Sequence, residues 1–136
     1  MQYTIQRQLT VVLQNQPGRL AAITHLMADQ DINILALSLT DNVEQGVIRL
    51  VTSDALLCKT LLVQAGFYVV EADVLVLEIT DSPGKLALLS KSLAEAQVNI
   101  DFAYASVFQP GEQTRLILKV SHIPIACQVL DTLKER

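Results

Sequence analysis

The spacing of apolar residues alternates between the two periods that distinguish strands from helices. In residues 9–13 every second residue is a large aliphatic one, which predicts a strand with one buried face. Residues 20–27 carry apolar side chains three and four positions apart, which predicts a helix that ends near Gln30. The same two periods then predict strands over residues 34–40 and 47–51, a helix that carries Leu57, Leu61 and Leu62, and a strand from residue 68 onward. Ser53 or Asp54 can cap this second helix, and Gly66 can end it in the left-handed conformation.

The second half of the chain repeats this order but stops one element earlier. The pattern predicts a strand, a helix, two strands and a final helix, over residues 74–79, 86–96, 100–108, 116–120 and 125–133. The sequence then ends at Arg136, so no fourth strand is predicted in this half. Turns are expected where Pro, Gly, Asn and Asp gather, at residues 15–18, 41–42, 81–84 and 110–111.

An internal repeat underlies the repeated order of elements. Two segments recur at an offset of 66 residues: Pro17-Gly18-Arg19-Leu20-Ala21 as Pro83-Gly84-Lys85-Leu86-Ala87, and Asn33-Ile34 as Asn99-Ile100. Both segments keep the same phase, without a gap between them. We therefore expect two related units, residues 1–72 and residues 73–136.

The order βαββαβ packs two helices on one face of an antiparallel four-stranded sheet. The expected fold class is α+β, with two ferredoxin-like units in tandem and a second unit that lacks its last strand. Its first strand would then be an exposed sheet edge, which proteins usually cover. Residues 1–8, a strand exchanged between the units or a second chain could cover this edge. We expect a homodimer in which the edge is shielded.

Composition and charge narrow the classes of function. The 136 residues are 51% hydrophobic and 18% charged, which excludes intrinsic disorder. The net charge of -4 argues against a nucleic acid partner, because such binding depends on basic residues. No stretch approaches about 18 apolar residues and no signal-peptide pattern is present, so we expect no membrane partner and a cytoplasmic location. Cys58 and Cys127 are expected to be reduced structural thiols.

The Pro-Gly turns and the Asn-Ile pairs, each in phase with the βαββαβ order, resemble those of ACT domains, which are small regulatory modules that bind amino acids. The resemblance covers nearly the whole chain, which is similar to stand-alone tandem ACT proteins without a catalytic domain. It implies a non-catalytic regulatory protein that binds a small amino acid where the first loop and helix of one unit meet the second strand of another. The bound amino acid would modulate a partner enzyme or pathway of amino-acid metabolism.

This resemblance makes the two loops and the residues before each second strand the candidate ligand-binding positions. The first N–H groups of a helix lack intrahelical partners, and together with the helix dipole they suit a ligand carboxylate. A glycine in the loop lets the ligand approach the backbone, and an Asn or Asp oxygen can accept hydrogen bonds from an α-ammonium. The candidates are Asn15, Gln16, Pro17, Gly18, Arg19, Leu20, Asn33, Ile34, Asp81, Ser82, Pro83, Gly84, Lys85, Leu86, Asn99 and Ile100.

The two candidate sites differ in charge. We expect the second loop to hold an α-ammonium better, because Asp81 is charged where Asn15 is neutral. Aliphatic residues of the second strands, such as Ile34, Leu35, Leu37 and Ile100, favour an apolar or aromatic ligand side chain. Binding would favour one packing of the units over another through its different affinity for the two states.

Other interpretations of the loops stay open. Pro-Gly turns begin helices without any ligand, which leaves a structural dimerisation or assembly module with degenerate pockets. Ser82 to Lys85 matches the S-x-x-K motif of acyl-enzymes, but no companion motif is present, so no catalytic residue is expected. His25 and His122 have no partner at metal-ligand spacing, so neither a metal nor a cofactor is expected.

The ferredoxin-like topology is also that of RNA-recognition modules. These modules stack bases on exposed aromatic side chains of the sheet. Phe102, Tyr104 and Phe108 share one face of a predicted strand, which fits such a platform. The matching strand of the first unit carries leucines, the RNP consensus is absent and the chain is acidic, so we favour packing for these rings.

Overall fold

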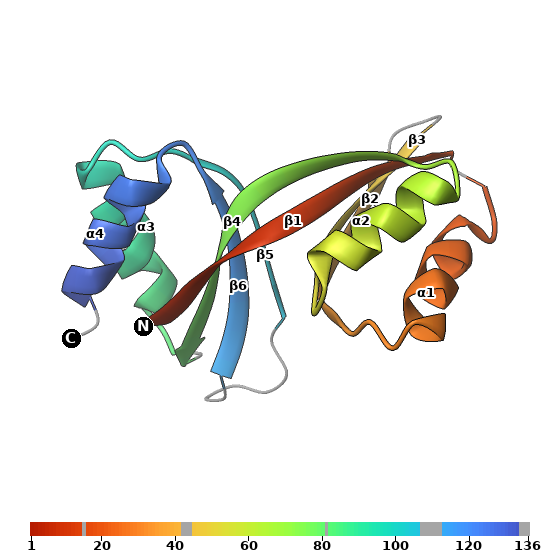
Figure 1. Cartoon of the computed structure of the whole chain (residues 1–136). Helices are drawn as coiled ribbons and strands as arrows, with labels where there is room; N and C mark the ends of the chain where they lie inside the picture. Colours follow the sequence, from red (N-terminus) through yellow and green to blue (C-terminus); the bar gives the residue numbers. More distant parts are fainter. Residues whose placement is uncertain (15, 42–44, 81, 107–112, 134–136) are drawn as a thin grey trace. The chain divides into compact units, whose positions relative to one another are not determined.

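The computed structural model describes residues 1–14, 16–41, 45–80, 82–106 and 113–133, and these form six strands and four helices (Figure 1). In chain order the elements are β1 (Gln2–Gln14), α1 (Arg19–Asp29), β2 (Ile34–Asp41), β3 (Gln45–Thr52), α2 (Ala55–Gln64), β4 (Tyr68–Thr80), α3 (Lys85–Glu95), β5 (Ile100–Ser106), β6 (Gln113–Val120) and α4 (Ile123–Leu133). The turns predicted at 41–42 and 110–111, and the ring of Phe108, lie wholly or partly outside the described residues.

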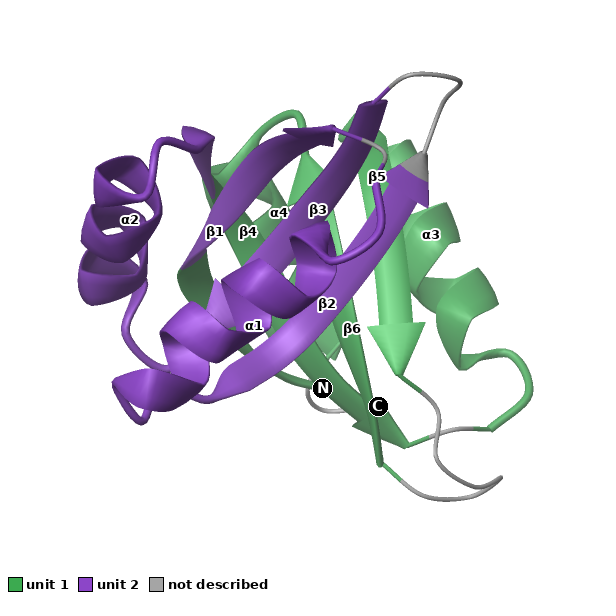
Figure 2. Cartoon of the chain, turned by 90° about the vertical axis from the view of Figure 1, so that its right-hand side faces the viewer, with its two compact units in different colours: residues 1–6, 73–136 green, residues 7–72 purple. Residues whose placement is uncertain are grey.

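The chain divides into two compact units, which Figure 2 colours separately. Residues 7–72 (purple) form what we call the N-terminal unit. Residues 73–136 together with residues 1–6 (green) form the C-terminal unit. The repeat predicts units of 1–72 and 73–136, so the difference lies in residues 1–6, which group with the later part of the chain.

Both units have the strand order of a ferredoxin-like fold. The neighbours run β2-β3-β1-β4 in the N-terminal unit and β5-β6-β4-β1 in the C-terminal unit. The pairs β1·β3, β2·β3, β4·β6 and β5·β6 are all antiparallel. Helices α1 and α2 lie beside the strands of the first, and α3 and α4 beside those of the second (Figure 1). The predicted α+β class with tandem ferredoxin-like units is confirmed.

The first residues of the chain supply the strand that the second repeat lacks. Residues 2–6 of β1 belong to the C-terminal unit, and β1 stands next to β4 in the strand order. Met1 and Tyr3 pack against the core of that unit. Of the three ways to cover the edge of β4, cover by N-terminal residues is the one observed. The exposed edge from which we inferred a homodimer is therefore absent from the described strands.

Strand β4 is continuous over 13 residues, where the sequence predicts two separate strands. Its first part contributes Val69 to the core of the N-terminal unit, and its second part contributes Leu75 and Leu77 to the core of the C-terminal unit. No glycine, proline or asparagine interrupts residues 68–80, so the two predicted strands can run on as one. One extended segment therefore serves both repeats.

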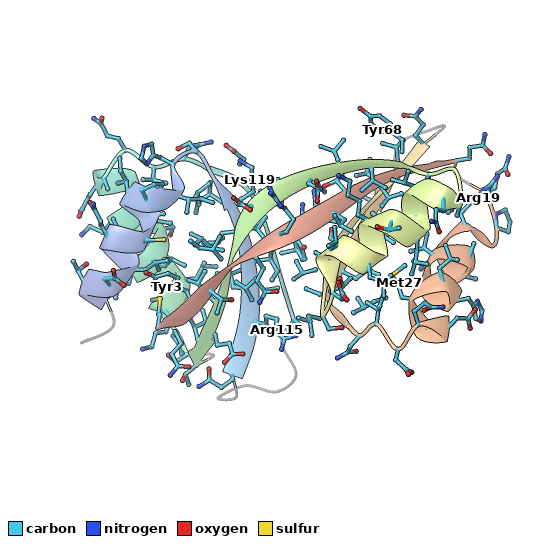
Figure 3. The ribbon with its side chains drawn as sticks, viewed as in Figure 1. Tyr3, Arg19, Met27, Tyr68, Arg115 and Lys119 are labelled. Carbon is cyan, nitrogen blue, oxygen red and sulfur yellow. The ribbon has the colours of Figure 1, made fainter. Side chains whose placement is uncertain are left out.

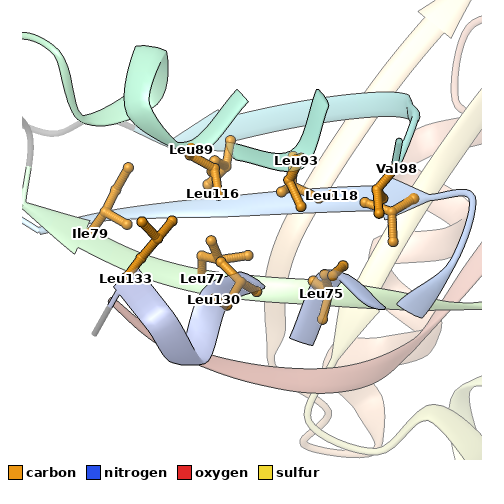
Figure 4. Packing of buried hydrophobic residues seen from close by; sticks show 12 residues of the cluster. Leu75, Leu77, Ile79, Leu89, Leu93, Val98, Leu116, Leu118, Leu130 and Leu133 are labelled. Carbon is orange, nitrogen blue, oxygen red and sulfur yellow. The ribbon is translucent and has the colours of Figure 1, made fainter. Parts of the chain in front are cut away.

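Each unit has its own aliphatic core. In the C-terminal unit, Leu89 and Leu93 lie one helical turn apart on α3 and face the leucines of β6 (Figure 4). In the N-terminal unit, α1 contributes Ile23 and Met27 and α2 contributes Leu62, all fully buried. Full burial of such a side chain stabilises the fold by about 1.5–3 kcal/mol. These cores fix the helices, and so fix the loops that precede them.

The ends of α2 match the sequence prediction. Asp54 is the N-cap, and its Oδ1 accepts a hydrogen bond of 3.0 Å from the N–H of Leu57. Gly66 follows the helix with a φ of +90°, the left-handed conformation that favours glycine. The N–H of Phe67 then bonds to the carbonyl of Leu62 at 3.0 Å, which closes the helix and leads into β4.

Candidate ligand-binding pockets

A pocket of about 300 Å³ lies at the start of α1 in the N-terminal unit. We call it the N-terminal pocket. It draws its lining from the end of β1, the loop that follows, the first turn of α1, and strands β2 and β3. The lining residues are Leu13, Gln14, Gln16, Gly18, Arg19, Leu20, Leu39 and Gly46.

The start of α1 presents backbone donors to this pocket. Gly18 is the N-cap, with a φ of +88°, and no side chain of the described residues caps the helix. The N–H of Ala22 bonds to the carbonyl of Gly18 at 3.0 Å. The N–H groups of Leu20 and Ala21 precede this bond, so helix geometry leaves them available to an external acceptor. A ligand oxygen could therefore take the place of a capping side chain.

Arg19 adds a full positive charge at the same helix end (Figure 3). Its Nη2 donates to Oε1 of Gln14 at 2.9 Å and, more weakly, to Oε1 of Gln16 at 3.4 Å. The first turn of α1 holds no acidic residue, and none of the described residues that line the pocket is acidic. The charge of Arg19 adds to the partial positive charge that the helix dipole places at the N-terminus of α1. This end of the pocket therefore favours an anion.

The other end of the pocket is apolar. Leu13 is buried, Leu20 is half-buried and Leu39 is 48% exposed. Leu13 pairs with Gly46 in the register of β1 and β3. Because residue 46 has no side chain, the space above this pair stays open between the leucines. The pocket thus joins a polar, positively charged end to an aliphatic one.

The C-terminal unit has an equivalent but smaller pocket, of about 130 Å³, which we call the C-terminal pocket. Its lining residues are Ile79, Thr80, Ser82, Lys85, Leu86, Ala105, Thr114 and Leu116. Ile79 pairs with Thr114 in the register of β4 and β6, as Leu13 pairs with Gly46 in the other unit. The repeat seen in the sequence therefore extends to the pockets.

Arg19 and Lys85 also border a second pair of equivalent hollows. In the N-terminal unit this hollow measures about 620 Å³ and is bounded by the segment Ala65 to Tyr68. In the C-terminal unit it measures about 340 Å³, and Met1 and Gln2 stand in place of that segment. The lining of these hollows supports the finding that the N-terminal residues replace the missing fourth strand.

The structure brings part of each predicted loop together. Of the candidate residues, those that line a pocket are Gln16, Gly18, Arg19 and Leu20 in the N-terminal unit, and Ser82, Lys85 and Leu86 in the C-terminal unit. Pro17, Pro83 and Gly84 are exposed beside the pockets without lining them. Asn15 and Asp81 lie outside the described residues.

Asn33 and Asn99 lie at the opposite ends of their strands from the pockets. The N–H of Asn33 donates to Oγ of Ser53, and the N–H of Ser53 donates back to the Asn33 carbonyl, both at 2.9 Å. Asn99 and Ser121 make the same two bonds at the same distance. Asn33 stands six residues before Leu39, or about 20 Å along an extended strand. These asparagines therefore join the strands of a hairpin.

The following residues, Ile34 and Ile100, pack against the two cores instead of lining a pocket. Leu39 and Gly46 do line the N-terminal pocket, although sequence reasoning did not select them. They belong to no motif, and only the pairing of β2 and β3 brings them beside the loop. The strand pattern was the sole sequence signal for either residue.

Metal binding and nucleophilic chemistry find little support among the side chains that the structure describes. The described residues contain no group of three His, Cys, Asp or Glu side chains placed to hold a metal ion. Cys58 is fully buried, and burial raises the pKa of its thiol to about 11, which disfavours the reactive thiolate. Nδ1 of His122 lies 3.3 Å from the N–H of Ile125, near the start of α4, and accepts from it.

The aromatic side chains of β5 stack on one another. The ring centroids of Phe102 and Tyr104 lie 6.3 Å apart with an angle of 21° between the planes, and both residues are half-buried. This arrangement fits the packing role that the sequence favours for them.

The helices within the described ranges all fall short of the length and hydrophobicity that a membrane crossing requires.

The structure therefore contains two ferredoxin-like units in tandem, each with a pocket where its first strand turns into its first helix. The chain belongs to the ACT domain pair family, whose model matches residues 3–134. The resemblance of the two Pro-Gly loops to ACT domains is thereby confirmed.

Solved structures with this fold cover nearly the whole chain. A protein from Bacteroides thetaiotaomicron is 27% identical, with a TM-score of 0.89 over 97% of this chain and 90% of that one. The regulatory subunit of aspartate kinase from Thermus thermophilus is 16% identical, with a TM-score of 0.70 over 96% and 95% of the chains. The same subunit from Thermus flavus is 17% identical, with a TM-score of 0.65 over 96% and 94%. No curated protein matches the sequence.

Proposed function

We propose that this protein is a non-catalytic regulatory module that binds a free amino acid in the N-terminal pocket. The observation that carries the proposal is the composition of that pocket. One end holds Arg19 and a helix start that no described side chain caps, and the other end holds the leucines 13, 20 and 39. This is the distribution of charge and apolar surface that an amino acid with an uncharged side chain requires.

Each group of a zwitterion has a partner in this arrangement. The carboxylate would accept bonds from the N–H groups of Leu20 and Ala21 and a charge-assisted bond from Arg19. The α-ammonium would donate to the side-chain oxygens of Gln14 and Gln16, which have lone pairs beyond those that Arg19 uses. On sequence grounds Asn15 is a further acceptor for the ammonium, as Asp81 is in the second loop.

The regulated partner in this proposal is a separate enzyme of amino-acid metabolism. Membership of the ACT domain pair family supports it, and so does the similarity of fold to proteins named as regulatory subunits of aspartate kinase. The ligand would act by its different affinity for two states of the chain.

The test is thermal unfolding of the full chain with each of the twenty amino acids at millimolar concentration. A ligand at about 100 times its dissociation constant stabilises a protein by about 2.7 kcal/mol, which raises the midpoint by several degrees. We expect Arg19→Gln to abolish this shift. Lys91→Gln is the matched control, because Lys91 is exposed on α3, where it pairs only loosely with Glu95 at 3.9 Å. A shift that survives Arg19→Gln, or no shift with any amino acid, would contradict the proposal.

One observation favours the alternative of an assembly module. Leu37 and Leu39 are 39% and 48% exposed on β2, which stands at the end of its strand order. Exposed leucines on an outer strand suit pairing with a second copy of the chain. Light scattering that shows a dimer at micromolar concentration, together with no amino-acid shift, would support this alternative.

A further inference from the structure

We propose that residue 46 and its counterpart Thr114 decide which pocket takes the ligand: the N-terminal pocket binds one amino acid with an aliphatic side chain, and the C-terminal pocket binds none. This inference rests on the proposed function and deepens it, since it names the class of ligand and the residue that selects it.

The two residues occupy the same place in the two units. Gly46 is opposite Leu13 in the pairing of β1 with β3, and Thr114 is opposite Ile79 in the pairing of β4 with β6. Each residue lines its own pocket. The exchange of glycine for threonine is therefore a direct difference between two equivalent sites.

Gly46 is needed for space and not for backbone conformation. A Cβ placed on Gly46 would lie 3.7 Å from the carbonyl oxygen of Thr40, 3.8 Å from Cδ1 of Leu39 and 3.9 Å from Cβ of Leu13. These are ordinary contact distances, so the fold tolerates a side chain here. Two of the three neighbouring atoms belong to leucines that line the pocket. A larger side chain at position 46 would therefore fill the aliphatic end.

The C-terminal pocket shows the result of such filling. Its volume is about 130 Å³, against about 300 Å³ for its counterpart. Pockets that hold small molecules measure about 300–1,000 Å³. The N-terminal pocket stands at the lower end of that range, which suits a ligand as small as an amino acid. The C-terminal pocket falls well below it.

Polarity also makes the C-terminal pocket a poorer match for an aliphatic ligand. Thr114 is only 5% exposed, and its Oγ1 has no hydrogen-bond partner among the residues that the structure describes. This hydroxyl is already buried away from water, and an aliphatic side chain beside it would supply no hydrogen-bond partner. Ala105 also stands where the N-terminal pocket has Leu39, so one apolar contact is missing.

The lining of the N-terminal pocket restricts which ligand side chains can bind there. In the N-terminal pocket, Arg19 is the only charged residue of the described lining, and it lies at the end that would hold the carboxylate. The opposite end offers leucines and the open space over Gly46. An aliphatic side chain such as that of leucine, isoleucine, valine or methionine fits this end, whereas an acidic or basic one would be buried there without a partner.

The experiment is isothermal titration calorimetry of the full chain with leucine, isoleucine, valine and methionine, and with lysine and aspartate for comparison. We expect one bound ligand per chain and a clear preference for an aliphatic amino acid. Gly46→Thr should weaken binding by about 10-fold or more, as expected when a hydrophobic pocket is filled. Thr114→Gly is the matched control: it should leave the affinity of the N-terminal pocket within about twofold, and any second ligand that the enlarged C-terminal pocket admits should bind more weakly.

Each other outcome overturns the inference. These outcomes are two equal ligands per chain, binding of only charged amino acids, full affinity in Gly46→Thr, or loss of binding in Thr114→Gly. Thermal unfolding without ligand checks that the variants fold, and Gly46→Ala, which adds only the tolerated Cβ, should give a smaller loss if Gly46→Thr does not fold. Absence of binding by all twenty amino acids would instead reject the proposed function, and this inference with it.

Discussion

The hydroxyl of Tyr3 donates a hydrogen bond of 2.8 Å to Oδ1 of Asp131, which is 128 residues away in the sequence. Tyr3 lies on β1 and Asp131 on α4, so the bond ties the first residues of the chain to the last helix of the C-terminal unit. The hydrogen bond to Asp131, assisted by burial, raises the pKa of Tyr3 well above its ordinary value of 10.0, because it favours the neutral phenol.

Removing this hydroxyl should destabilise the protein. We expect Tyr3→Phe to lower the free energy of unfolding by about 1 kcal/mol, the usual contribution of one hydrogen bond. Urea unfolding followed by circular dichroism would measure the change. Tyr68→Phe is the matched control, because Tyr68 is 69% exposed on β4 and should show no comparable loss.

The same pair predicts a dependence on alkaline pH. Below pH 10 the phenol is neutral in both states, and the bond contributes fully. As the pH rises above 10, the unfolded chain loses the phenol proton while the folded chain keeps it, so the contribution is lost. The difference in unfolding free energy between the natural protein and Tyr3→Phe should therefore shrink between pH 9 and pH 11. A difference that grows over this interval would contradict the assignment.

Deletion of residues 1–6 should destabilise the C-terminal unit selectively. The deletion removes the part of β1 that belongs to the C-terminal unit and the contacts of Met1 and Tyr3 with the core. An unpaired strand edge promotes association. We expect a lower unfolding midpoint and a mass that rises with concentration in light scattering, where the full chain serves as the reference. A truncated protein with unchanged mass and midpoint would show that these residues are not required.

The two cysteines should differ in reactivity. Cys58 is fully buried on α2 and its pKa is raised to about 11, whereas Cys127 on α4 is half-buried. The thiolate is the reactive form. At pH 8 we therefore expect iodoacetamide to modify Cys127 first and Cys58 only after unfolding. Mass spectrometry of the native protein would show one modified site, and early modification of Cys58 would argue against its buried position.

Acidic pH should weaken one ion pair on the surface of the N-terminal unit. Nζ of Lys59 lies 2.9 Å from Oε2 of Glu71, and this hydrogen bond lowers the pKa of Glu71 below its ordinary value of 4.5. A lowered pKa means that the pair contributes above pH 4.5 and that the contribution disappears as the pH falls through the folded-state pKa. Glu71→Gln should therefore flatten part of the acid loss of stability in urea titrations between pH 6 and pH 3. Glu95→Gln, in the looser pair with Lys91, is the control.

The spacing of apolar residues was sufficient to predict the helices and strands, because an element with one buried face needs apolar side chains at regular intervals. The positions Leu89 and Leu93 on α3, or Leu9 and Leu13 on β1, follow directly from such spacing. The strands predicted from residue 68 onward and over residues 74–79 are one strand, β4, because the period of a strand does not reveal whether one strand ends and another begins. Only partners in the sheet decide that.

The candidate site was predicted in part. Arg19 and Lys85 stand at the starts of two helices that the repeat places in register, so the sequence located both loops. Leu39 and Gly46 could not be found in this way, since their place beside the loop depends on pairing between strands distant in the sequence. Asn33 and Asn99 also recur in the repeat, but they bond to Ser53 and Ser121 at the ends of two hairpins. A residue that recurs in a repeat can have a shared structural role as readily as a binding role.

The sequence by itself determined the two units, the order of their elements and the position of the loops. These features rest on local spacing and on the recurrence at 66 residues, both of which are written along the chain. The tertiary structure decided that residues 1–6 complete the C-terminal unit and that the N-terminal pocket, which Gly46 lines, is the larger of the two. The physical reason is the same for both: strand pairing is a long-range choice, made by the burial of side chains from both partners, and no single segment encodes it.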